Sequence, residues 1–257
     1  MSMIKHAIPL LEYDDAPTAV IDPNHEGLEL SLPSRAVFAF LQDHVDAYAT
    51  SHGARIVGYF KTITKDYPVY VLTHKGEELC LCQAPLGAPA AAQFLDWLIA
   101  YGAKKIISGG CCGALEPIPE NTFLIPARAL RDEGTSYHYL PPARFVEVDA
   151  AARGAVRATL EEQKISWQEV TTWTTDGFYR ETKEKVAYRR AEGCTVVDME
   201  CSALAAVAER RGVQWGQLLF TADSLANVDA YDERGWGKDS FEIALRLCLD
   251  AVLKLND

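Results

Sequence analysis

The sequence predicts an α/β fold, a single domain with a central twisted mixed sheet flanked by helices. The chain has 257 residues, which is enough to bury a substantial core. Hydrophobic residues make up 49% of it and charged residues 24%, as is typical of globular proteins. Through the second half of the chain, short apolar segments typical of strands alternate with segments of helical periodicity.

The first half is predicted to hold a helix, three strands and a second helix. Apolar residues over 33–52 recur at helical spacing, which predicts a helix. Three short segments rich in Val, Tyr and Leu follow, and they predict strands over residues 55–60, 67–72 and 79–84. A turn at Gly87 then leads into an amphipathic helix that ends at Gly102.

The second half is predicted to alternate between strands and helices. A buried strand over 105–108 is expected to break at a glycine-rich loop over 109–113. Further strands are expected over residues 122–126, 168–174, 195–199 and 215–222. Helices are expected over residues 150–162, 181–191, 200–211 and 239–255. No repeat, linker or low-complexity segment interrupts this order, so we expect one domain over 1–257.

Charge and cysteine content argue against several classes of protein. The net charge of −11 disfavours binding to nucleic acid or to an anionic membrane. No apolar run reaches the roughly 18 residues of a membrane span, and residues 1–12 lack the long apolar region of a secretory signal. Seven cysteines, an odd number, are typical of free thiols in a reducing cytoplasm. Cys80 and Cys82 have no second ligand pair, so we expect no metal site.

Ligands of open α/β folds bind at the carboxyl ends of strands, and four such ends carry unusual residues. The glycines of 109–113 let the backbone approach a ligand closely, or simply form a tight turn. Phe178 and Tyr179 follow a predicted strand, where aromatic rings either stack on a planar ligand or cover the core.

Carboxyl groups mark the other two strand ends. Asp198 and Glu200 flank Met199 where an apolar strand meets an apolar helix. The helix dipole accounts for one acid, but a second unpaired buried carboxylate is costly. A carboxylate that faced a pocket would accept hydrogen bonds from sugar hydroxyls well. Asp223 ends an apolar strand, where it is either a turn or N-cap residue or a desolvated general acid.

Taken together and in this order, these segments resemble the nucleoside phosphorylase superfamily, which includes hexameric purine nucleoside phosphorylase, uridine phosphorylase and related nucleosidases. The resemblance extends from about Cys80 to Leu255. Its motifs are residues 104–115, 175–179, 197–200 and 221–223. It implies a nucleoside phosphorylase-like domain.

The resemblance also implies a role for each matched residue. Asp223 would protonate or hydrogen-bond the leaving base, and Arg234 would assist it. The substrate-binding residues would be Glu200 on the ribose hydroxyls, Met199 under the sugar, Phe178 against the base, and Cys111, Cys112 and Gly113 along the base and sugar edge.

The activity implied is that of a pentosyltransferase of nucleoside salvage. Such an enzyme cleaves the N-glycosidic bond of a purine or pyrimidine nucleoside with phosphate, giving free base and ribose 1-phosphate. No cofactor is implied beyond phosphate as co-substrate. Arg234 favours a purine substrate, whereas the segment 131–139 resembles a loop of the uridine phosphorylase branch and favours a pyrimidine. This segment could instead form a surface or subunit contact.

The residues that bind phosphate in this family are largely missing from the chain. The family's Gly-Asp-Pro-x-Arg segment is matched only by Ile-Asp-Pro-Asn-His at 21–25, while Ser108 replaces an arginine and Cys111 a hydroxyl residue. Phosphate is best bound by guanidinium groups, and the candidates to replace them are His25, Lys65 and Arg180. A nucleosidase that uses water, and a nucleoside-binding protein without catalysis, therefore stay as alternatives.

The resemblance further implies a cytoplasmic homo-oligomer, built from dimers and up to a hexamer in size. In such an assembly a residue of one subunit closes the site of its neighbour. His6, near the N-terminus, is the candidate for that role.

Overall fold

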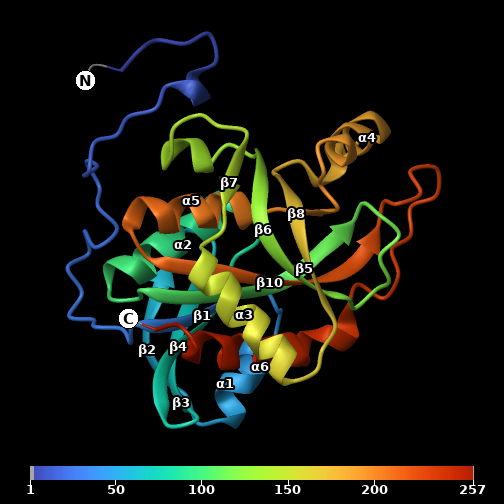
Figure 1. Cartoon of the computed structure of the whole chain (residues 1–257). Coiled ribbons are helices and arrows are strands. Elements are labelled where there is room, and N and C mark those ends of the chain that lie inside the picture. Colours follow the sequence, from blue (N-terminus) through green and yellow to red (C-terminus); the bar gives the residue numbers. More distant parts are fainter. Residues whose placement is uncertain (1–2, 257) are drawn as a thin grey trace.

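Ten strands of the described residues, 3–256, join one mixed sheet in the computed structural model (Figure 1). They are β1 (Arg35–Ala39), β2 (Arg55–Lys61), β3 (Asp66–His74), β4 (Glu77–Gln83), β5 (Lys105–Ala114), β6 (Phe123–Asp132), β7 (Phe145–Glu147), β8 (Trp167–Thr175), β9 (Val196–Asp198) and β10 (Gln214–Ser224). Their order is β10-β6-β8-β9-β5-β1-β4-β3-β2, with β7 beside β6. Parallel and antiparallel pairs both occur, which confirms the predicted mixed sheet.

Helices cover both faces of the sheet, as predicted (Figure 1). The α-helices are α1 (His44–Ser51), α2 (Ala88–Ala100), α3 (Ala150–Glu162), α4 (Lys183–Ala191), α5 (Cys201–Arg211) and α6 (Phe241–Leu253). Short 3-10 helices lie at Pro9–Leu11, Ser136–His138, Phe178–Arg180 and Lys238–Ser240. On one face α2 and α5 pack with Phe38 and Ile106, and on the other α1, α3 and α6 pack with Val37 and Ile107. Adjacent strand residues thus enter different cores.

The sheet closes on itself at one end. Because β10 pairs with both β5 and β6, the strands β5, β10, β6, β8 and β9 form a ring. Within it β5 runs parallel to β10, whereas β9 runs antiparallel to β5 and parallel to β8. The carboxyl ends of β5 and β10 therefore approach those of β8 and β9 from opposite directions, and both sets face one cavity.

The segment 33–52 is not one helix, which corrects the prediction. Its first part is β1, and α1 begins only at His44. β1 lies between β4 and β5 and is buried on both faces, so its apolar residues do not alternate with polar ones. Spacing alone does not distinguish such a short apolar run from part of a helix.

The glycine-rich segment 109–113 is not a loop either, because β5 continues through it to Ala114. The strand pairs with β10 on one side, and with β1 and then β9 on the other. These glycines are required by space. An added Cβ would lie 2.6 Å from Cys248 Sγ at Gly109, and 2.9 Å from Val197 Cγ1 at Gly113.

Residues 3–34 form an extended segment that runs along the outside of α2 and α5 (dark blue in Figure 1). Arg210 of α5 donates to the carbonyl of Asp15 at 2.8 Å, and Trp97 of α2 donates to Glu26 at 3.2 Å. Several large apolar side chains of this segment are exposed: Met3, Ile4, Ile8, Val20 and Ile21. The part of the N-terminal prediction that concerns residues 1–2 lies outside the described residues.

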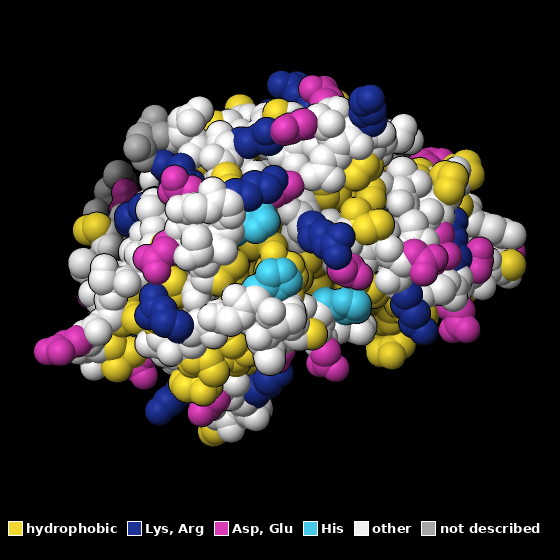
Figure 2. Space-filling model, turned by 90° about the horizontal axis from the view of Figure 1, so that it is seen from below, with side chains coloured by type: hydrophobic (Ala, Val, Ile, Leu, Met, Phe, Trp, Pro, Cys, Tyr) yellow, Lys and Arg dark blue, Asp and Glu magenta, His cyan; other side chains and the backbone are white. Residues whose placement is uncertain are grey.

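Figure 2 shows the molecule from below, where basic and acidic side chains are interspersed among apolar ones. No continuous basic patch occurs on this face. Of the helices within residues 3–256, none has both the length and the apolar character needed to cross a bilayer.

Candidate active site

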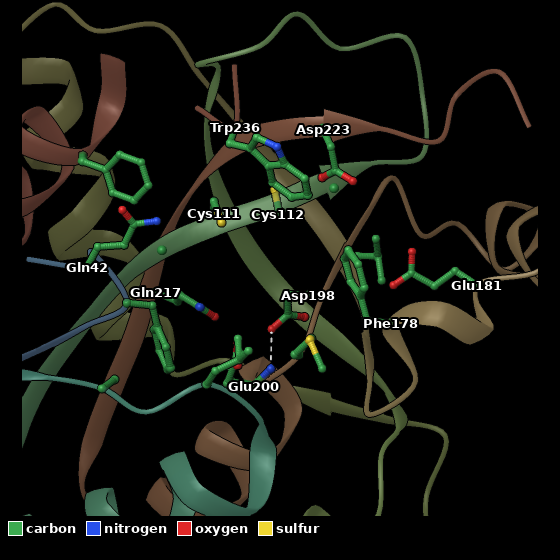
Figure 3. Close-up of a pocket in the computed structure, with 18 of the residues that line it drawn as sticks. Gln42, Cys111, Cys112, Phe178, Glu181, Asp198, Glu200, Gln217, Asp223 and Trp236 are labelled. Atoms are coloured by element: carbon green, nitrogen blue, oxygen red, sulfur yellow. Dashed lines mark hydrogen bonds between the residues drawn. The ribbon is translucent and has the colours of Figure 1, made fainter. Parts of the chain in front are cut away.

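The carboxyl ends of β5, β8, β9 and β10 surround a cavity of about 610 Å³ (Figure 3). Seven of the eight predicted site residues line it: Asp223, Glu200, Met199, Phe178, Cys111, Cys112 and Gly113. Arg234 does not belong to this lining. The four motifs, which are far apart in the sequence, therefore meet at one place in the fold.

Glu200 lies where β9 meets α5, and its side chain is buried at the cavity wall. Its Oε1 accepts a hydrogen bond of 2.6 Å from the backbone N–H of Gly87, which precedes α2. Burial, followed by the nearby charge of Asp198, raises the pKa of Glu200 to about 8. This carboxyl therefore holds a proton near neutral pH, and it can exchange hydrogen bonds with sugar hydroxyls.

Asp198 stabilises the junction that carries Glu200. Its Oδ2 accepts from the backbone N–H groups of Glu200 at 2.9 Å and Cys201 at 2.6 Å. Its Oδ1 accepts from the hydroxyls of Thr172 and Thr174, both at 2.8 Å. All four hydrogen bonds are buried, so this carboxylate fixes the start of α5 to β8. The first of the two acids flanking Met199 thus has an evident structural role.

Asp223 faces the cavity from the end of β10. Its Oδ2 accepts a hydrogen bond of 3.1 Å from the hydroxyl of Tyr231. Burial raises the pKa of Asp223, while the Tyr231 hydrogen bond and the Arg234 charge counteract part of that rise. The carboxyl also needs the absence of a side chain at Gly113, where a Cβ would lie 3.2 Å from Asp223 Oδ1.

Arg234 lies close to this region but points elsewhere. Its Nη2 donates to the carbonyl of Ile118 at 2.9 Å, and its Nε lies 3.6 Å from Asp232 Oδ2. The side chain acts on Asp223 only through its charge. The direct hydrogen-bond partner of Asp223 is Tyr231, a residue that the sequence analysis missed.

Glu181 is a second missed residue, and it faces the cavity near Asp223 (Figure 3). Burial and the charge of Asp223 raise its pKa to about 7. The predicted helix over 181–191 would include Glu181, but α4 starts at Lys183. Thr182 is the N-cap of α4, and its side chain accepts a hydrogen bond from the N–H of Lys185. Because Thr is a preferred N-cap residue, it could have predicted where this helix begins.

Aromatic side chains form much of the remaining wall. Phe178 projects into the cavity between Asp198 and Glu181, and Trp236 lies across from it near Cys112 (Figure 3). The Phe178 ring packs edge-on against Tyr179, with centroids 5.0 Å apart. These rings provide planar apolar surface on which a base can stack.

Cys111 lines the cavity and is the one exposed cysteine of the described residues. Desolvation inside the cavity, together with the charges of Glu200 and Asp223, raises the pKa of its thiol to about 11. The thiol is therefore neutral at physiological pH and is a poor nucleophile.

Neutral amides line the end of the cavity away from Phe178 and Glu181, where Figure 3 shows Gln42 and Gln217. Gln42 follows β1, Gln83 ends β4, and Gln217 lies in β10. The Oε1 atoms of Gln83 and Gln217 are buried without a hydrogen-bond partner among the described residues. This end of the cavity is thus supplied with unused hydrogen-bond acceptors.

No Lys, Arg or His of the described chain lines this cavity, whereas Glu181, Asp198, Glu200 and Asp223 all do. The three residues considered for phosphate binding, His25, Lys65 and Arg180, lie elsewhere. Residues 21–25, which match the family's phosphate-binding segment only weakly, belong to the exposed N-terminal segment. After β1, Phe40 and Gln42 line the cavity. Among residues 3–256, no three His, Cys, Asp or Glu side chains form a metal-binding group.

The cavity continues into a second chamber of about 530 Å³. Five residues line both spaces: Phe178, Tyr179, Glu181, Asp223 and Trp236. The second chamber lies between the start of α4 and the loop that follows β10.

This fold and this arrangement of motifs define a class of protein, the N-glycosidic enzymes of nucleoside metabolism. A family model described as the phosphorylase superfamily matches residues 34–254, and the chain belongs to that superfamily. Among curated proteins, guanosine phosphorylase of Halorubrum lacusprofundi is 26% identical over 200 residues. That match covers 74% of this chain and 82% of the relative. The predicted family is thereby confirmed.

Solved structures share the fold. A uridine phosphorylase of Vibrio fischeri superimposes with a TM-score of 0.75 at 23% identity, covering 91% of this chain and 94% of the other. An AMP nucleosidase of Bacteroides thetaiotaomicron superimposes with a TM-score of 0.70, also at 23% identity, covering 86% and 88%. The fold is thus common to a phosphorylase and a nucleosidase.

Proposed function

We propose that this protein is a nucleosidase, which cleaves the N-glycosidic bond of a nucleoside with water to give free base and ribose. The observation that carries the proposal is the charge of the cavity. Four carboxyl groups line it, and no cationic side chain of the described residues does. Inorganic phosphate carries one to two negative charges at neutral pH, and no side-chain cation of the described residues would compensate for removing those charges from water.

In the proposed reaction, a general acid assists the departure of the base. Breaking the bond builds positive charge on the sugar and negative charge on the base. Asp223 faces the cavity with a raised pKa and would deliver a proton to the base, which Phe178 would hold by stacking. General acid catalysis of this kind is worth about 10²–10⁴-fold in rate.

The sugar would lie between the base and the amide-lined end. Glu200 would bind ribose hydroxyls, with Met199 beneath the sugar and Cys111, Cys112 and Gly113 along its edge. The unpartnered Oε1 atoms of Gln83 and Gln217 would accept hydrogen bonds from the attacking water. The oxygen of this water would bond to C1 of the sugar as the bond to the base breaks, and the proton that the water loses would return through solvent to Asp223.

Phosphorolysis by a pentosyltransferase is the second candidate, and the name of the curated relative, guanosine phosphorylase, favours it. In that reaction backbone N–H groups of β5, or a residue of another subunit, would have to bind phosphate in place of side-chain cations. A nucleoside-binding protein without catalysis is the third. We propose no cofactor for either hydrolysis or phosphorolysis, apart from phosphate as the co-substrate of phosphorolysis.

The assembly and location proposed for the protein are those of a cytoplasmic homo-oligomer, with dimers as the basic unit. The exposed apolar side chains of residues 3–34 support self-association. His6 is exposed on this segment and does not line the cavity of its own chain, so its proposed role is at a neighbour's site. Sedimentation of the wild type and of a variant lacking residues 1–12 tests this proposal.

The reaction is tested by incubating the protein with a panel of purine and pyrimidine nucleosides and measuring release of free base over a phosphate titration. The proposal predicts release at full rate without phosphate. Saturable dependence on phosphate would instead establish phosphorolysis. Binding of a nucleoside with no release under either condition would identify a binding protein.

A further inference from the structure

The second chamber adjoins the candidate active site at the place where the base of a nucleoside would lie. Asp223 and Phe178, the proposed proton donor and stacking residue, line both spaces. Glu200 and the three glutamines line only the first. The second chamber therefore lies beyond the base, on the side away from the sugar and the attacking water.

The walls of this chamber are mainly apolar. Val186 of α4 is fully buried behind it, and Leu225, Val228 and Tyr231 contribute from the segment after β10. Tyr231, Trp236 and Tyr179 are exposed by 55%, 39% and 92%, so large aromatic surfaces are left in contact with water. Exposed apolar surface gathered in a cavity is typical of a binding site.

Two polar side chains that line this chamber, Lys183 and Tyr231, already have partners. The Lys183 ammonium pairs with Asp229 at 2.5 Å, and the Tyr231 hydroxyl donates to Asp223. An occupant would therefore meet chiefly aromatic and aliphatic carbon. Because ligand pockets commonly measure roughly 300–1,000 Å³, the first cavity alone is large enough for an unsubstituted nucleoside.

We propose that the second chamber is a subsite for a large apolar or aromatic substituent on the base, and that the preferred substrates are nucleosides that carry one. This inference rests on the proposed function, because that function places the base at Asp223. The substituent would extend from the base past Phe178 and Trp236 and displace water from the surrounding rings.

The test compares matched pairs of nucleosides by calorimetric binding and by base release. Adenosine is paired with N6-benzyladenosine, and uridine with 5-benzyluridine, because the sequence does not decide between purine and pyrimidine. In at least one pair, the benzyl compound is expected to bind about tenfold or more tightly, the scale of adding a few carbon atoms to a hydrophobic pocket. Equal or weaker binding of both benzyl compounds would overturn the proposal and would indicate that another part of the assembly fills the chamber.

A variant that fills the chamber tests the location. Val228 lines only the second chamber and is 36% exposed, so Val228→Trp should occupy the space without disturbing the core. It should abolish most of the preference for the benzyl compound. Val20→Trp makes the same change on the exposed N-terminal segment and should retain the preference. Preference retained in Val228→Trp would overturn the assignment of the chamber.

Binding and cleavage separate this inference from the proposed function. A benzyl preference in binding without cleavage in water would support the subsite and contradict the nucleosidase. Cleavage in water without a benzyl preference would support the nucleosidase and contradict the subsite.

Discussion

Carboxyl groups dominate the candidate site, and burial determines how they are protonated. Glu200 and Glu181 have pKa values raised to about 8 and about 7, and the pKa of Asp223 is raised as well. For each, loss of water is the largest cause. Glu200 is therefore largely protonated near pH 7, and the raised pKa of Asp223 favours its role as proton donor to a leaving base.

The raised pKa of Glu200 makes a prediction about stability. Its value rises from 4.5 to about 8 on folding, so the folded state holds the proton more tightly and the free energy of unfolding falls as the pH rises from about 4.5 to 8. Glu200→Gln removes this penalty and keeps an acceptor for the Gly87 N–H. The variant should match the wild type near pH 4 and exceed it by up to roughly 5 kcal/mol at pH 9, at about 1.4 kcal/mol per pKa unit.

Urea unfolding at both pH values measures this difference. An advantage of Glu200→Gln that does not grow with pH would contradict the raised pKa. As a comparison, Glu162→Gln removes an exposed carboxyl whose pKa is lowered by Lys254, and it should gain nothing at high pH. Turnover of a nucleoside by Glu200→Gln should fall far more than binding of the free base, because ribose hydroxyls that donate to Glu200 favour its ionised form, which Gln cannot adopt.

Asp223→Asn tests the proton donor. The amide keeps the shape and can still donate a hydrogen bond, but it cannot transfer a proton. For a natural nucleoside the rate should fall by roughly 10²-fold or more. For a nitrophenyl riboside, whose leaving group needs no protonation, the loss should be much smaller. Equal losses on both substrates would mean that Asp223 only positions the base.

At the scale of elements, the start of α5 is fixed by one buried side chain. Asp198→Ala would leave two backbone N–H groups and two threonine hydroxyls without their acceptor, and it should cost roughly 2–4 kcal/mol of unfolding free energy. Asp198→Asn should recover most of this, because its carbonyl can face the N–H groups while its NH₂ donates to the threonine oxygens.

Thermal and urea unfolding of both variants check this prediction. Asp149→Ala is the control, since Asp149 is an exposed N-cap that accepts one N–H, from Ala152 in α3. It should cost about 1 kcal/mol. An Asp198→Ala cost no larger than that of the control would show that the buried network does not support the helix.

The elements differ in how far the sequence predicts them. The amphipathic pattern and Asp149 cap define α3, whose predicted bounds, residues 150–162, are those of the structure. β1 and the glycines of β5 were missed because pairing with strands distant in sequence determines them, and no local pattern reports that pairing. The start of α4, and with it the position of Glu181, could have been predicted from the N-cap type of Thr182.

At the scale of the whole molecule, the ring of five strands brings the motifs together. β5 and β10 approach from one direction and β8 and β9 from the other, so Asp223 and Glu200 reach one cavity from opposite sets of strands. The resemblance named seven residues that line this cavity. Tyr231 and the glutamines carry no motif, and only the folded arrangement reveals them.

The most direct test of the account is the identity of the sugar product. A nucleoside that the protein cleaves should be incubated in ¹⁸O-labelled water with saturating phosphate, and the sugar analysed by mass spectrometry as it forms. Because no cationic side chain of residues 3–256 lines the cavity, the expected product is ribose that carries the label at C1, in the same yield with and without phosphate. Unlabelled ribose 1-phosphate, formed only with phosphate present, would contradict the central claim.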